Sequence, residues 1–201
     1  MIMPSNNKSG IVHYFAGRYP GKIGLLLSPE GYDKGKPPFY MPYALDNGCF
    51  KRWDEKGFFF MLRKATWVHA PLWVVCPDVV ANHEETLKRW HEYSPLITGY
   101  GFKTAFACQD GCEPEDVPKD AYCCFIGGST EFKLNEAHRF KGVAEWLHIG
   151  RVNTETRLDW AERIGADSID GTGFFKDKSD NKYRAFVEFF EGKKQMKLDG
   201  F

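Results

Sequence analysis

The amino-acid sequence predicts a compact (β/α)8 TIM-like barrel, the α/β fold in which eight parallel strands close on themselves inside a ring of helices. Three observations support this expectation. Short apolar runs alternate with amphipathic helix patterns, eight such runs occur, and polar residues follow most of them. The 201 residues match the lower size limit of about 200 residues for this fold. We therefore expect a single domain over residues 1–201.

The eight predicted strands are apolar runs rich in Val, Ile, Phe and Tyr, as buried parallel strands usually are. Helix patterns separate the later runs, and strands joined by helical crossovers run parallel. In chain order the runs cover residues 11–17, 23–29, 39–48, 72–80, 103–111, 121–128, 145–152 and 166–173.

Three helices are predicted between the later apolar runs. Asn82 can cap the first, with a glutamate three residues later as its capping-box partner. An apolar stripe predicts the second over residues 131–146, and Thr154 can cap a third that ends at Gly165. The first half shows fewer helix patterns, so we expect it to be irregular, with loops such as residues 28–38. An open doubly wound sheet is the alternative architecture.

The composition is that of an ordinary globular protein, with 43% hydrophobic and 27% charged residues and a formal net charge of zero. A protein that grips long duplexes is usually basic, so any contact with nucleic acid requires a local patch. No signal peptide is recognisable and no apolar run could span a bilayer, so we expect no membrane partner and a cytoplasmic location. The six cysteines lack the paired spacing of a zinc site, which predicts reduced thiols and no metal.

Polar and glycine residues lie at the C-terminal ends of the predicted strands. In a parallel barrel these ends share one face, and that face carries the active site. Each residue alone also has a simpler explanation, since an Asp before Asn or Gly is usually a turn residue and a His in an apolar run usually belongs to the core. Their repetition favours one shared cavity. The set comprises Asp46, Asp78, Gln109, Gly127, Gly128, His148, Arg151 and Asp170.

The same stretches, in the same order, resemble the tRNA-guanine transglycosylase superfamily. The pieces ALDNGCF, CPD, ACQDG, IGGS and GADSIDGTGF are similar to the superfamily's D-S-G-G-F, strand-end Asp, Q-G-G, G-G-L and G-x-D-x-F-D. The resemblance extends from about Leu45 to Phe174, and HIGRVNTETRLDWAERIGADSIDGTGF is its most specific part. It is closer to the short phage branch that inserts 7-deazaguanine bases into DNA.

The resemblance implies a role for each matching residue. Asp170 matches the nucleophilic aspartate, and Asp46 matches the second aspartate, which handles protons. Asp78 and Gln109 match the residues that read the edge of the base. Gly127–Gly128 matches the glycine turn whose backbone amide binds the base carbonyl.

The sequence departs from the family pattern in three places. D-S-G-G is replaced by D-N-G-C, with Asn47 and Cys49, and Asp110 displaces the second glycine of Q-G-G. The cysteine-rich zinc insertion that helps the family to hold tRNA is missing. The resemblance therefore favours DNA over tRNA as the nucleic-acid partner, a free 7-deazaguanine as the second substrate, and no cofactor. A phage origin would place the protein in the host cytoplasm.

Base exchange gives physical reasons for these residue types. Lengthening the bond from C1′ to the base creates positive charge on the sugar, which an ionised Asp170 can stabilise and trap as an ester. Asp46, or less directly His148, can protonate the departing base. Phe50 can stack on a base flipped out of the duplex. Phosphate contacts are expected from Arg151, Lys176, Lys178, Lys182 and Arg184, with residues 176–182 forming a solvated loop.

Other functions also fit the sequence. The same chemistry on tRNA would give a tRNA-guanine transglycosylase, and water as the acceptor would give an N-glycoside hydrolase. A protein that keeps the base pocket without turnover would be a nucleobase or nucleic-acid binding module. In an enzyme, Asp46 and Asp170 should face one cavity from opposite sides, whereas an Asp46 that caps a turn outside the cavity would favour the binding module. An unrelated barrel enzyme would bind a phosphorylated metabolite through residues 171–173. The sequence is compatible with a homodimer and with the need for a partner protein, and it identifies neither.

Overall fold

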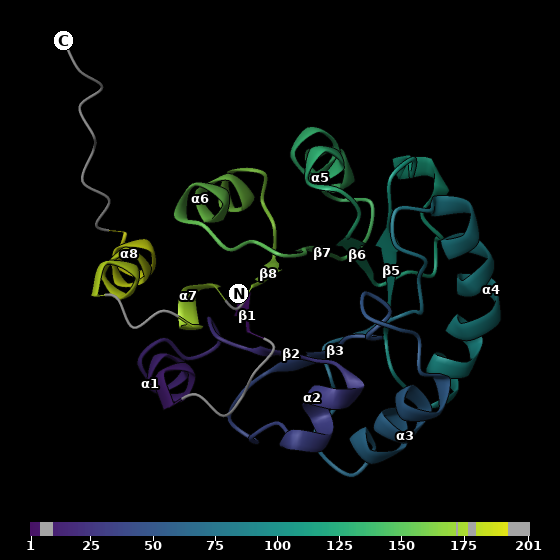
Figure 1. Ribbon diagram of the computed structural model, residues 1–201, viewed down its shortest axis with the longest axis horizontal. Helices are drawn as coiled ribbons and strands as arrows, with labels where there is room; N and C mark the ends of the chain where they lie inside the picture. The colour runs from purple at the N-terminus through teal and green to yellow at the C-terminus, as the bar shows by residue number, and fades with distance from the viewer. Residues whose placement is uncertain (5–9, 172, 177–179, 193–201) are drawn as a thin grey trace.

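The computed structural model, which describes residues 1–4, 10–171, 173–176 and 180–192, is a parallel barrel surrounded by helices (Figure 1). Its strands form one eight-stranded sheet in the order β1-β8-β7-β6-β5-β4-β3-β2, with parallel neighbours throughout. A bridge between Ile2 and Ile23 joins the two ends of this order. The predicted (β/α)8 barrel is therefore confirmed, and the open sheet is not.

Seven of the eight predicted strand runs contain a strand. The first run is wrong, because residues 11–17 lie in helix α1 (Gly10–Arg18), where Val12, Phe15 and Ala16 are buried at helical spacing. The strand in its place has only two residues, too few for a recognisable pattern. The strands are β1 (Ile2–Met3), β2 (Leu25–Leu27), β3 (Tyr43–Leu45), β4 (Val74–Val75), β5 (Thr104–Cys108), β6 (Cys123–Ile126), β7 (Trp146–Ile149) and β8 (Ser168–Asp170).

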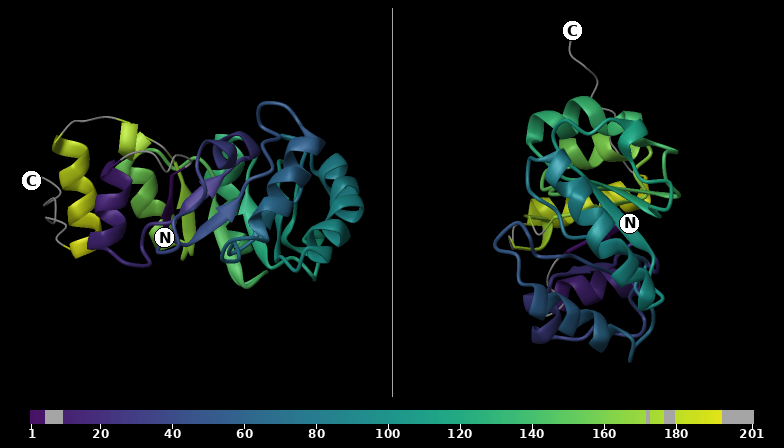
Figure 2. Two further views of the ribbon diagram at one scale, coloured as in Figure 1. Left: turned by 90° about the horizontal axis from the view of Figure 1, so that it is seen from below. Right: turned by 90° about the vertical axis from the view of Figure 1, so that its right-hand side faces the viewer.

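Helices cover the outer face of the barrel (Figure 1). Helix α8 lies beside α1 in Figure 2, and an Arg18–Glu191 ion pair of 2.6 Å joins them. Besides α1, the helices are α2 (Pro29–Lys34), α3 (Glu55–Ala65), α4 (His83–Gly99), α5 (Thr130–Glu136), α6 (Glu155–Arg163), α7 (Gly173–Lys176) and α8 (Asp180–Glu191), with 3-10 turns η1 (Pro114–Asp116) and η2 (Ala137–Phe140).

The helix caps predicted between the later apolar runs are confirmed. The side chain of Asn82 caps α4 and that of Thr154 caps α6, each by accepting from a backbone N–H three residues on. Gly165 follows α6 with a φ of 76°, the left-handed geometry that glycine adopts most readily. The helix expected over residues 131–146 is shorter, because α5 passes into η2 and the chain turns toward β7.

The expectation of loops in the first half is wrong. Ser28 caps α2, Pro29 occupies its first turn, and Asp54 caps α3. Both are ordinary helix starts that the search for apolar stripes passed over. The solvated loop expected over residues 176–182 is also wrong at both ends, since α7 ends at Lys176 and α8 begins at Asp180.

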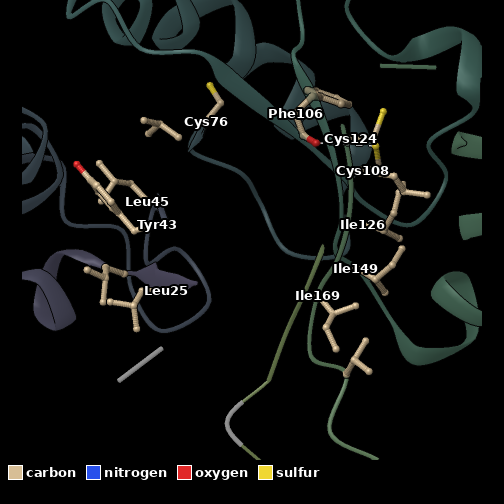
Figure 3. Packing of buried hydrophobic residues seen from close by; sticks show 14 of the residues in the cluster. Leu25, Tyr43, Leu45, Cys76, Phe106, Cys108, Cys124, Ile126, Ile149 and Ile169 are labelled. Atoms are coloured by element: carbon tan, nitrogen blue, oxygen red, sulfur yellow. Dashed lines mark hydrogen bonds between the residues drawn. The ribbon is translucent and has the colours of Figure 1, made fainter. Parts of the chain in front are cut away.

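Alternating side chains along each strand divide the core into two layers. In β2, Leu25 and Leu27 face the helices while Leu26 faces the barrel interior. Figure 3 shows part of the outer layer, with Ile126, Ile149 and other side chains from successive strands. The inner layer comprises Met3, Leu26, Ala44, Trp73, Val75, Ala105, Ala107 and Cys123.

This inner layer fills the barrel and forms a floor below the C-terminal ends of the strands. Active sites in this architecture are built above such a floor. Among the described residues, no helix is both long and apolar enough to cross a membrane.

Candidate active site

A cavity of about 210 Å³ opens at the C-terminal ends of the strands. Its floor is apolar, with Leu26, Val75, Ala107 and Phe125, and its wall is polar. The wall contains Phe50 and every predicted strand-end residue except His148, which lies directly behind it. The wall residues are Asp46, Asn47, Phe50, Asp78, Gln109, Gly127, Gly128, Gly150, Arg151 and Asp170.

Asp170 and Asp46 line this one cavity, from the ends of β8 and β3. The Asp170 side chain is only 19% exposed, so it does not project into bulk solvent. Its Oδ1 accepts hydrogen bonds from Nε2 of His148 at 3.1 Å and from the backbone N–H of Arg151 at 3.0 Å. These two hydrogen bonds hold the carboxyl group in one orientation.

The backbone around Asp170 is shaped to bring these donors close. Arg151 has a φ of 60°, a left-handed conformation that costs a non-glycine residue about 1–3 kcal/mol and often marks a functional site. Its neighbour Gly150 has no room for a side chain, because a Cβ would lie 3.1 Å from the carbonyl oxygen of Ile126 and 3.4 Å from Oδ1 of Asp170.

Asp46 differs from Asp170 in its electrostatic surroundings. Burial, together with the negative charges of Asp78 and Asp170, raises the pKa of Asp46 from 3.8 to about 7, while backbone N–H groups of Gly48 and Asn47 partly oppose the shift. A carboxyl group that titrates near neutrality can both give and take a proton under physiological conditions. Asp46 is therefore suited to proton transfer, and Asp170, held by two donors, to a role that needs a fixed orientation.

Asp78 is held in place by two side-chain amides. Asn47 donates to Oδ1 of Asp78 at 2.8 Å, and Gln109 donates to Oδ2 at 2.5 Å. The Gln109 carbonyl in turn accepts from the backbone N–H of Ala81 at 2.9 Å, which fixes the orientation of the amide. Burial raises the pKa of Asp78, and the Asn47 hydrogen bond opposes that shift. Asn47, which appeared only as a departure from the family pattern, is thus part of the site.

The glycine pair after β6 is required by close packing. A Cβ on Gly127 would lie 2.6 Å from Nε2 of Gln109, and Gly128 has a φ of 68°. The carboxylate of Asp110 accepts from the backbone N–H of Ser129 at 2.8 Å and so supports this turn from outside the cavity. The displaced glycine of the family motif is therefore replaced by a residue with a structural contact.

His148 is fully buried and belongs to a hydrogen-bond chain that ends on Asp170. Nε1 of Trp146 donates to Oγ of Ser168 at 2.7 Å, and Oγ lies 2.7 Å from Nδ1 of His148. Among the described residues, Nδ1 is the one acceptor within reach of the Ser168 hydroxyl, so His148 carries its proton on Nε2 and donates it to Asp170. Burial lowers the pKa of His148, which agrees with a neutral ring. His148 therefore orients Asp170 from behind.

Arg151 and Phe50 lie at the mouth of the cavity. The guanidinium carbon of Arg151 lies 4.9 Å from the centre of the Phe50 ring, and the group also donates to the carbonyl oxygen of Gly128. Phe50 is 67% exposed, so one face is available to a planar ligand.

Of the other predicted phosphate-binding residues, only Arg184 has a described side chain. Arg184 is exposed on α8 and is not among the residues that line the cavity. Lys178 lies outside the described residues, as do the side chains of Lys176 and Lys182, so those three predictions remain predictions.

One group of side chains elsewhere could hold a metal ion. The donor atoms of His83, Cys112 and Asp116 lie within 4.8 Å of one another, and Nε2 of His83 is 3.4 Å from Oδ2 of Asp116. No sequence pattern indicates this group, because 28 residues separate the histidine from the cysteine and no paired motif links them. None of the three residues lines the cavity.

Comparisons with known proteins agree with the fold and go no further. No family model and no curated protein matches this sequence. A solved structure of native KDPGal superposes with a TM-score of 0.55 at 13% identity, covering 95% of this chain and 93% of that one. A porous protein cage designed by fusing symmetric oligomeric domains gives a TM-score of 0.55 at 14% identity over 95% and 71% of the two chains. At such identities the likeness supports the barrel fold alone.

Proposed function

We propose that this protein is a base-exchange transglycosylase that replaces guanine in a nucleic acid, DNA in the first place, with a 7-deazaguanine. The observation that carries the proposal is the pairing of Asp170 with Asp46 across one cavity. One carboxylate is oriented by two hydrogen-bond donors, and the other titrates near neutral pH. A positioned nucleophile and a separate proton carrier are what exchange at C1′ requires.

In the first half of the reaction, Oδ2 of Asp170 forms a bond to C1′ of the sugar while the bond from C1′ to N9 of guanine breaks. Oδ1 already accepts two hydrogen bonds, which leaves Oδ2 as the attacking atom. The electron pair of the broken bond leaves with the base, and the neutral carboxyl group of Asp46 supplies the proton that the base takes up.

In the second half, the incoming 7-deazaguanine occupies the position of the departed guanine. Its ring N–H gives a proton to the Asp46 carboxylate, and the nitrogen attacks C1′ as the bond to Oδ2 of Asp170 breaks. Asp46 is then protonated and Asp170 ionised, as at the start. Two displacements at one carbon retain its configuration.

The polar wall offers the complement of a guanine edge. The carboxylate of Asp78 can accept from the ring N1–H and the exocyclic amino group. Gln109 keeps one amide hydrogen after donating to Asp78, and the backbone N–H of Gly128 donates to no described residue. Both can donate to O6. A 7-deazaguanine presents the same edge, so one pocket serves both bases.

DNA is favoured as the substrate by one feature of the sequence. The sequence has no cysteine-rich insertion of the kind that helps related enzymes to hold tRNA. A base in a duplex must be flipped into the cavity at a cost of a few kcal/mol, or be taken from a single strand. The arginine and aromatic ring at the mouth, Arg151 and Phe50, are suited to hold an extruded base.

The direct experiment incubates the protein with DNA or tRNA and a labelled 7-deazaguanine, followed by nucleoside analysis. We expect the label in DNA and an equal amount of released guanine. Asp170→Asn should abolish both, and Asp33→Asn, which removes an exposed carboxylate on α2, should change neither. Guanine released with abasic sites would indicate a hydrolase. Binding of the base with no release of guanine from either nucleic acid would indicate a binding module.

A further inference from the structure

Lys133 on α5 is a buried lysine without a partner. The residue is only 5% exposed, yet no carboxylate lies within ion-pair distance of its ammonium group among the described residues. No hydrogen bond from its Nζ to a described residue is present either. Lysine is rarely buried unless it is paired, because removing an ammonium group from water is costly. The Nζ atom itself is not fully enclosed, so an anion can reach this unpaired cation from solvent.

Two further cations share the cleft that Lys133 lines. Arg151 and Arg157 border it from the end of β7 and from α6. The cleft is lined by Thr130, Lys133, Leu134, Ile149, Gly150, Arg151, Val152, Arg157 and Trp160, and this lining contains no carboxylate.

The cleft adjoins the active-site cavity. Gly150 and Arg151 line both, and Gly150 lies against Oδ1 of Asp170. Whatever binds between Lys133 and the two arginines is therefore next to a sugar whose C1′ faces Asp170. In a nucleic acid, the group next to such a sugar is a phosphate.

The electrostatics of Lys133 agree with an anion site. Burial, followed by repulsion from Arg151 and Arg157, lowers the pKa of Lys133 to about 8, although Asp170 and Asp110 act in the opposite direction. A bound anion would offset the cost of burying the ammonium group and reduce its repulsion from the two arginines.

We propose that Lys133, Arg151 and Arg157 bind one phosphate of the substrate strand, adjacent to the nucleotide whose base enters the cavity. The cleft has a volume of about 10 Å³, which is room for one oxygen-sized atom. One phosphate oxygen therefore enters to meet Lys133, while the rest of the group lies outside, where planar guanidinium groups can contact it. The assignment to a substrate strand rests on the proposed function, whereas the binding of phosphate does not.

The first test measures phosphate binding without catalysis. Inorganic phosphate is titrated into the wild-type protein, Lys133→Met, Arg157→Met and the control Lys103→Met, which removes a cation that contacts Tyr122 ahead of β5. We expect saturable binding to the wild type and the control, weakened about tenfold or more in the first two variants. Unfolding of each variant is followed in parallel. Methionine keeps most of the length of the lysine side chain and removes its charge, so a variant that unfolds like the wild type and binds phosphate more weakly has lost a contact and not its fold.

The second test separates a strand phosphate from a free one. Single-stranded oligonucleotides carry a neutral methylphosphonate on the 5′ or the 3′ side of the target guanosine. We expect one of the two substitutions to weaken binding by the wild type about tenfold and to have little further effect in Lys133→Met.

Phosphate binding that is equal in the wild type and Lys133→Met, with both methylphosphonates tolerated, would overturn the phosphate site even if base exchange is observed. Phosphate binding that depends on Lys133, without base exchange, would keep the site and reject the transglycosylase. Phosphate binding with both methylphosphonates tolerated would reject the strand assignment.

Discussion

The side-chain amide of Asn47 donates a hydrogen bond of 2.8 Å to Oδ1 of Asp78 inside the cavity. Asn47 is 3% exposed and also donates to the backbone carbonyl of Cys76, so its amide is fixed between β3 and β4. The residue that replaces the serine of the family motif thus orients the carboxylate proposed to read the base.

Replacing Asn47 by Leu should therefore weaken base binding. Removing the donor leaves a buried carboxylate with one partner fewer, and a hydrogen bond to a charged group contributes about 1.5–3 kcal/mol. We expect the Kd for free guanine to rise by about one to two orders of magnitude in equilibrium dialysis, with kcat for bound substrate less affected. Asn47→Asp should be worse, because it adds a negative charge beside Asp78. An unchanged affinity for guanine in Asn47→Leu would mean that Asp78 does not take part in base recognition.

The pKa of Asp46 makes a prediction about stability that does not depend on activity. In the folded protein this pKa is about 7, against 3.8 for an unperturbed aspartate, so between these pH values the folded state holds one proton more than the unfolded state. The stability contributed by Asp46 therefore falls as pH rises from about 4 to 7. Asp46→Asn should match the wild type in denaturant unfolding at pH 4 and exceed it at pH 8, by up to about 4 kcal/mol. Equal stability at both pH values would contradict the raised pKa.

The same group should also appear in the pH profile of the reaction. Departure of guanine needs protonated Asp46, so kcat/KM for base release should fall as pH rises above about 7. In Asp46→Asn we expect a loss of at least about 100-fold and a profile without this inflection. An inflection that persists in the variant would assign it to another group.

His148 provides a test of positioning against proton transfer. Glutamine can place an N–H where Nε2 of His148 lies 3.1 Å from Asp170, whereas methionine cannot. We expect His148→Gln to keep kcat within several-fold of the wild type and His148→Met to lose about 10- to 100-fold, as for one hydrogen bond to a charged group. Histidine-labelled NMR should show His148 neutral with its proton on Nε2, and Ser168→Ala should disturb that tautomer. Equal loss in both variants would mean that His148 carries a proton.

Phe50 should contribute affinity and little stability. Its ring is exposed and lies outside the core, so removing the ring should cost little folding stability. Stacking of a base on an aromatic ring, in contrast, contributes about 1–3 kcal/mol to binding. Phe50→Ala should raise the Kd for guanine about 5- to 100-fold without a change in melting temperature. Phe39→Ala provides the matched control, since Phe39 is 89% exposed and does not line the cavity. Equal affinities for guanine in the two variants would mean that Phe50 does not contact the base.

Much of this site was predictable because a parallel barrel gathers the ends of its strands. Asp46, Asp78, Gln109 and Asp170 each follow an apolar run, and the fold alone places them on one face. The first strand was not predictable, since β1 has two residues and owes its place to pairing with β8. The helix over residues 11–17 contains β-branched and aromatic residues that also suit a strand.

The supporting residues of the site could not be predicted from the sequence, for a different reason. In the sequence, Lys133 is one of several polar residues of a helix and cannot be told from a solvent-exposed lysine. Its burial depends on how α5 packs beside β7. Ser168 acquires its role only through register, because His148 is its partner in the pairing of β7 with β8. Local sequence carries neither kind of information.

The proposed reaction requires a covalent bond between Asp170 and C1′ of a substrate sugar. To detect it, the protein is incubated with a guanine-containing oligonucleotide in the absence of an incoming base and denatured rapidly, and any adduct is mapped by peptide mass spectrometry. We expect an adduct with the mass of the oligonucleotide minus guanine on the peptide containing Asp170, absent from Asp170→Asn and lost on adding 7-deazaguanine. An adduct on another residue, or base exchange by Asp170→Asn at the wild-type rate, would contradict it.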